Sequence, residues 1–255
     1  MKYVFLPLLL FFVVTGCNPN RSVLQGLDRD IIKLSNNMKA EVAASRNDPD
    51  KIMAISTRFQ DKMITLLDGA IAKTTGDDKK LLNLARSVVV DVKATEKDLE
   101  IKATKFEKEF TIDAASIVSM KEVNKNAELL KEYGAAMDKY ETFYKNLSSQ
   151  IRKDGNAIGS EGSMKGFISG MIMGMKKKIP SILKVTKATK VLLASYSEFN
   201  SFMGSKLNKF KKSGQDVLFD EQSDADKYNA LISKLQKEAA ELEKVSMALI
   251  QQAVQ

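Results

Sequence analysis

The apolar residues of this chain recur at steps of three and four over most of its length, which is the spacing of an amphipathic helix. The first predicted helix follows such a stripe from Leu24 to Val42, and a second begins at Pro49 and fades at Thr74–Asp77. Pro49 suits a first helical position and Asp48 suits the N-cap before it. The two stripes contain Leu24, Leu27, Ile31, Leu34, Met38 and Val42, then Ile52, Ile55, Phe59, Met63 and Leu66.

Four further helical segments follow the same pattern. They span about residues 78–110, 113–151 and 164–212, and the last begins near Ser223, where Ser223 and Asp226 have the spacing of a capping box. Thr111 marks a boundary between the third and fourth segments, although one long bent helix also fits. Pro180 predicts a kink or break in the fifth. An aromatic set in the fourth is predicted to be core with its hydroxyls at the rim, with a ligand cleft as the alternative: Tyr133, Tyr140, Phe143 and Tyr144.

Proline is scarce and the alternation typical of strands is absent, so the sequence predicts an all-α fold. The expected architecture is an elongated antiparallel bundle of about five to six long helices. It forms a single domain over residues 23–255. The glycine-rich composition of 153–163 predicts a loop there and a possible hinge.

The first residues predict a targeting segment. Lys2 is followed by an apolar run from Tyr3 to Val14, which suits a signal peptide and is shorter than a membrane-spanning helix. The run ends in Val14-Thr15-Gly16-Cys17, which resembles the lipobox of bacterial lipoproteins. The resemblance implies a signal peptide over 1–16 and cleavage between Gly16 and Cys17. It also implies diacylglycerol and an N-acyl chain such as palmitate on Cys17, with residues 17–22 as a lipidated tether. An ordinary secretory signal with an unrelated cysteine is the alternative.

The amino-acid composition excludes several classes of catalytic site. Cys17 is the only cysteine and the chain has no histidine, so no intramolecular disulfide can form and Ser-His-Asp and Cys-His catalysis are excluded. No nucleotide-binding fingerprint or metal-ligand spacing occurs. The sequence therefore predicts a protein that is not an enzyme, with no metal, catalytic residue or cofactor other than the covalent lipid.

Positive charge is concentrated in one region. Residues 165–212 contain eleven basic residues and one acidic residue, whereas residues 213–255 contain four basic and eight acidic residues. A lysine face beside apolar residues is typical of a helix that meets anionic headgroups. The predicted anionic-surface residues are Lys176, Lys177, Lys178, Lys184, Lys187 and Lys190. The alternative prediction, held about equal, is that the lysine face is exposed to solvent and pairs with acidic residues of the last helix, such as Glu238, Glu241 and Glu243.

Glycines recur every fourth residue at the start of the same segment, among several methionines. Gly-x-x-x-Gly spacing allows two helix backbones to approach closely, and it is common between membrane helices. The predicted close-packing positions are Gly162, Gly166, Gly170 and Gly174. One interpretation is a membrane-active or self-associating segment over 162–193. The favoured one is a tightly packed core turn or a partly unstructured stretch, because Met164–Met175 is too short to span a bilayer.

The C-terminal segment is similar to the YiaF-type lipoproteins of enterobacteria, a family of unknown function. The similarity rests on Phe219, Ala225, Tyr228, Asn229, Leu231, Ile232 and Leu235 behind a lipobox, about a tenth of the chain. It implies a Gram-negative envelope and transfers no catalytic residue. Asn18 after the cysteine implies the outer membrane, facing the periplasm. The expected partners are the membrane, anionic lipid, lipopolysaccharide, cell-wall polymer or an envelope protein, and not nucleic acid.

Overall fold

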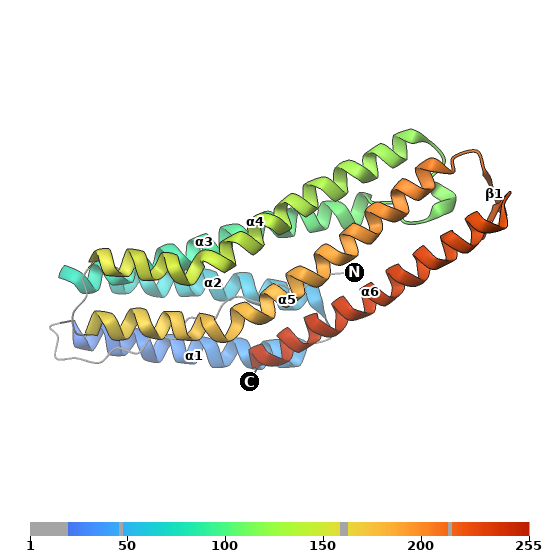
Figure 1. Ribbon diagram of the computed structural model, residues 1–255. Coiled ribbons are helices and arrows are strands. Elements are labelled where there is room, and N and C mark those ends of the chain that lie inside the picture. Colours follow the sequence, from blue (N-terminus) through green and yellow to red (C-terminus); the bar gives the residue numbers. More distant parts are fainter. Residues whose placement is uncertain (1–19, 46–47, 159–162, 214–215, 255) are drawn as a thin grey trace. The chain divides into compact units, whose positions relative to one another are not determined.

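The computed structural model describes residues 20–45, 48–158, 163–213 and 216–254 (Figure 1). The predicted all-α fold is confirmed, because six long helices account for most of these residues. The helices are α1 (Arg21–Ser45), α2 (Pro49–Ile71), α3 (Gly76–Glu109), α4 (Met120–Ile158), α5 (Ser163–Ser205) and α6 (Gln222–Val254). A short 3₁₀ turn, η1 (Ala114–Ser116), and two strands, β1 (Phe210–Ser213) and β2 (Asp216–Phe219), complete the order.

The chain divides into two compact units. Unit 1 comprises Asp98–Lys139 and Lys184–Met247. Unit 2 comprises the described residues of Lys2–Lys97, Tyr140–Leu183 and Ala248–Gln255. Helices α3, α4, α5 and α6 each contribute to both. The single domain expected over 23–255 stays a prediction.

In unit 2, α1 and α2 pack against each other through the two predicted stripes. Ile31 and Val42 of α1, and Ile52 and Met63 of α2, are at most 2% exposed. Each such side chain contributes about 1.5–3 kcal/mol by leaving water. The predicted cap is confirmed as well: the Asp48 carboxylate accepts the backbone N–H of Lys51, and α2 begins at Pro49.

The core of unit 1 is rich in aromatic rings. Phe106 and Phe110 stack with their centroids 4.5 Å apart, and Tyr196 packs against both. A second group surrounds the antiparallel β1–β2 hairpin, in which Phe210 pairs with Phe219. The Phe219 ring lies 5.4 Å from that of Tyr228 in α6. A two-stranded hairpin is marginal in water by itself, so this packing holds it.

An asparagine network joins the α3–α4 connection to the helices of unit 1. Asn126 is 1% exposed, and its amide accepts from the N–H of Thr111 and donates to the C=O of the same residue. It also donates to the side-chain oxygen of Asn200, whose own amide donates to the C=O of Val123. The connection therefore has a fixed backbone although it contains little regular structure.

Three local predictions were wrong. The loop expected over 153–163 begins later, because α4 continues to Ile158. Gly155 continues the buried positions of Leu147 and Ile151 by one more turn, and a Gln150–Asp154 hydrogen bond supports that turn. The packing outweighs the cost of one helical glycine, about 1 kcal/mol. Residues 159–162 lie outside the described residues.

The other two concern the C-terminal third. The fifth helical segment, predicted to continue to residue 212, ends at Ser205, and residues 210–213 pair with 216–219 as two strands, because the Phe219 ring packs against Phe202 and Tyr228. The capping box at Ser223 does not form, because α6 starts at Gln222 and the carboxylate of Asp226 accepts the amide of Gln222. At Pro180, where a kink or break was predicted, α5 continues from Ser163 to Ser205 without a break. The missing N–H of the proline costs the helix one hydrogen bond.

Candidate functional site

The chain is fixed to unit 2 three residues after Cys17. Gly16 and Cys17 lie outside the described residues, whereas Asn20 is 8% exposed. Its amide donates to the carboxylate of Asp78 at 2.8 Å and to the C=O of Thr75 at 3.3 Å. Helix α1 then begins at Arg21, so the last two residues of the tether expected over 17–22 are already helical. Three residues of extended chain span at most about 10 Å, which limits the distance between the Cα atoms of Cys17 and Asn20.

Four of the six lysines predicted on α5 are exposed. Lys176 and Lys177 belong to unit 2, and Lys184 and Lys187 belong to unit 1. Glu198 is the only acidic residue of α5. Within the described parts of the chain, no carboxylate forms an ion pair with these four side chains.

Lys190 has a different environment, since its ammonium lies 2.6 Å from the carboxylate of Asp138 in α4. The predicted alternative was a lysine face that pairs with Glu238, Glu241 and Glu243. Among the described residues, the ion pairs of α6 are instead Lys206–Asp224, Lys234–Glu198 and Lys244–Glu241. The alternative therefore finds no support in the pairs that the structure contains.

Lys178 points inward, unlike its two neighbours. It follows Met171 and Met175, both fully buried, and precedes buried Ile182 at helical spacing, so it belongs to the buried stripe of α5. Its Nζ is inaccessible to solvent and has no hydrogen-bond partner among the described atoms. Desolvation, and secondly the charge of Lys39 in α1, lower the pKa of Lys178 to about 8. The structure thus does not bring Lys178 to the exposed lysines.

The glycine series can be followed at three of its four positions. Gly162 lies outside the described residues, Gly166 is exposed, and Gly170 and Gly174 are half-buried. A Cβ atom added at Gly166 would meet nothing within 4 Å, so this position has no close neighbour in the described chain. Met173, in contrast, is 62% exposed. None of the described helices is long and apolar enough to cross a membrane.

Sequence reasoning missed a buried carboxyl group in unit 2. Glu96 of α3 accepts the side-chain amide of Gln60 at 2.6 Å and the hydroxyl of Tyr144 at 2.8 Å. Desolvation raises the pKa of Glu96 to about 7, although both hydrogen bonds oppose the rise. The Tyr140 and Tyr144 hydroxyls are buried with it rather than at the rim, and burial raises the pKa of both well above the usual value. The signal in the sequence was a glutamate among the apolar positions of α3.

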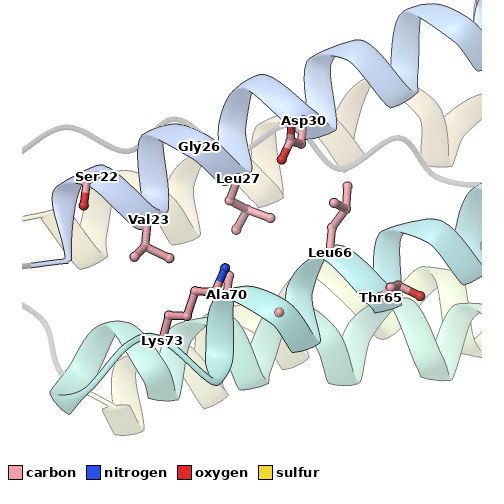
Figure 2. A pocket seen from close by; sticks show the side chains of 10 residues that line it. Ser22, Val23, Gly26, Leu27, Asp30, Thr65, Leu66, Ala70 and Lys73 are labelled. Carbon is pink, nitrogen blue, oxygen red and sulfur yellow. The ribbon is translucent and has the colours of Figure 1, made fainter.

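A groove of about 350 Å³ lies between α1 and α2 in unit 2 (Figure 2). It exists because Gly26 and Gly69 have no side chains: a Cβ atom at either would meet nothing within 4 Å. Val23, Leu27, Leu66 and Ala70 supply apolar lining, and Asp30 and Lys73 supply charge. The groove lies next to the fixed start of α1, because Ser22 also lines it.

The described residues contain no group of three or more His, Cys, Asp or Glu side chains that could hold a metal ion. Comparison with protein-family models, with curated proteins and with solved structures gave no match to this chain. The resemblance to the YiaF-type lipoproteins therefore stays a prediction, and the function has to be inferred from the surface and the tether.

Proposed function

We propose that this chain is a non-catalytic lipoprotein, anchored through Cys17 and sorted by Asn18 to the periplasmic face of the outer membrane, that binds an anionic surface or partner through α5. The observation that carries the proposal is the exposure of Lys176, Lys177, Lys184 and Lys187 without a carboxylate partner in the described chain. Unpaired ammonium groups are free to meet phosphate or carboxylate groups of a partner. The absence of histidine from the sequence supports a binding role over catalysis.

The anchor and the lysines have separate tasks. The acyl chains on Cys17 hold the protein at the membrane, because more than one chain is needed for stable anchoring. The lysines of α5 then select an anionic partner: phospholipid, lipopolysaccharide, cell-wall polymer or an acidic envelope protein. A protein that is already anchored meets such partners at high effective concentration, so weak contacts are sufficient.

Charge reversal on α5 tests the binding role. The lipidated protein, held in neutral vesicles, is expected to capture labelled phosphatidylglycerol vesicles or lipopolysaccharide. Changing Lys176, Lys177, Lys184 and Lys187 to Glu should weaken capture by more than about a hundredfold, since each basic residue near an anionic surface contributes about 1 kcal/mol. Salt should weaken capture by the wild-type protein in the same direction.

The matched control reverses four exposed lysines on other helices, Lys62, Lys131, Lys139 and Lys237, with the same change in net charge. Capture by this control variant should remain close to that of the wild type. Salt-insensitive capture that survives reversal of the α5 lysines would rule out the binding role.

A further inference from the structure

Because Asn20 is held in unit 2, the part of unit 2 around Asn20 is the part that lies closest to a lipid on Cys17. The start of α1 is hydrogen-bonded to the turn between α2 and α3 through Thr75 and Asp78. In unit 2, the starts of α1 and α3 and the end of α2 therefore lie together (Figure 1). Since the tether spans at most about 10 Å, this end cannot move far from a bilayer that contains the acyl chains.

The charges at this end suit an anionic surface. Arg21, Lys73 and Lys79 are exposed, and within the described chain no carboxylate forms an ion pair with any of them. Of the acidic groups nearby, Asp77 pairs with Lys80, whereas Asp78 accepts the neutral amide of Asn20 and keeps its negative charge against the three basic groups. The end thus has an excess of unpaired positive charge.

Its shape also allows close approach. The turn contains exposed Ala72, Thr75 and Gly76, all with small side chains or none. Gly76 has a φ of +64°, which a residue with a side chain adopts only with strain, so the tight turn depends on it. Figure 2 shows the Lys73 side chain reaching from the end of α2 into the groove between α1 and α2.

We propose that this part of unit 2, named the tether end and defined by Arg21, Lys73 and Lys79, docks onto the anionic headgroups of the bilayer that holds the lipid of Cys17. The inference rests on the proposed lipidation and adds an orientation to it. The short tether holds the basic groups near the headgroups, where salt screens their attraction to anionic lipid only in part.

A fluorophore on the tether end tests the docking. Cys17 is the only cysteine and its sulfur is blocked by lipid, so Thr75→Cys in the full-length lipidated protein provides a single free thiol. In vesicles that contain phosphatidylglycerol and a headgroup nitroxide lipid, the fluorophore should be strongly quenched. Quenching should fall in neutral vesicles with the same nitroxide content.

Changing Arg21, Lys73 and Lys79 to Glu should lower the ratio of docked to undocked protein by about a hundredfold, since each basic residue contributes a factor of about five. Arg21 and Lys79 lie in the first turns of α1 and α3, where glutamate is favourable to the helix dipole, so the variant should remain folded. Reversal of Lys131, Lys139 and Lys237 is the matched control and should leave quenching unchanged.

Two results would overturn the docking. One is equal quenching of the Thr75→Cys probe in anionic and neutral vesicles. The other is an equal loss of quenching in the tether-end and control variants. Failure of the proposed lipidation would be seen separately, as protein that does not stay on neutral vesicles or that lacks lipid on Cys17 by mass spectrometry.

Discussion

Replacing Glu96 by Gln is expected to raise the free energy of unfolding by about 3 kcal/mol at pH 8 and to leave it nearly unchanged at pH 4. Burial favours the neutral carboxyl, so the folded pKa of about 7 lies above the ordinary value of 4.5. Glu96 therefore binds its proton more tightly in the folded state than in the unfolded state, so protonation of Glu96 stabilises the fold. This contribution is fully present below about pH 4.5 and is lost as the pH rises through about 7.

The measurement is a denaturant titration of both proteins at several pH values, in which the difference between variant and wild type is followed. Other carboxylates titrate equally in the two proteins and cancel in that difference. Glutamine keeps an amide that can serve Gln60 and Tyr144, so the packing is conserved. A pH-independent difference would show that Glu96 does not titrate in this range.

Tyr144→Phe provides a matched check on the same cluster. It removes the hydroxyl that donates to Glu96 and keeps the ring in place. Loss of a donor to a buried carboxyl should lower the free energy of unfolding at pH 8, in contrast to the gain expected from Glu96→Gln.

The second large effect is expected at Asn126 in unit 1. Changing Asn126 to Leu should lower the free energy of unfolding by about 3 kcal/mol, because it leaves the backbone groups of Thr111 and the side chain of Asn200 without their partner. Denaturant titration gives the total loss. Hydrogen exchange should show faster opening of residues 110–119, which the network holds.

Asn146 provides the control, since it is exposed on the same helix. Asn146→Leu should change the free energy of unfolding by less than about 0.5 kcal/mol. Similar losses in the two variants would mean that the network does not fix the α3–α4 connection.

Local features of the fold could be predicted from the sequence, and features that depend on distant packing could not. The stripes of α1 and α2 and the Asp48–Pro49 start are local, and the structure contains them. The hairpin at 210–219 depends on Phe202 and Tyr228 from two other helices. The pattern of the strand residues does not show that aromatic rings from other helices pack on the hairpin.

The same distinction holds for the candidate sites. The concentration of lysine in α5 is visible in the sequence. Which of these lysines are exposed, and that Lys178 is buried, depends on which face of α5 packs against the other helices. That face could have been inferred from Met171, Met175 and Ile182, which Lys178 joins at helical spacing. The partners of Glu96 come from α2 and α4, so only the three-dimensional structure identifies a shared buried site.

The central claim is that Cys17 carries lipid and holds a helical binding protein at a membrane. Mass spectrometry of the N-terminal peptide, isolated from the native envelope, tests it most directly. We expect a mature chain that begins at Cys17, with diacylglycerol on the sulfur and an acyl chain on the new amino terminus. A chain that begins elsewhere, or a free thiol at Cys17, would contradict the claim.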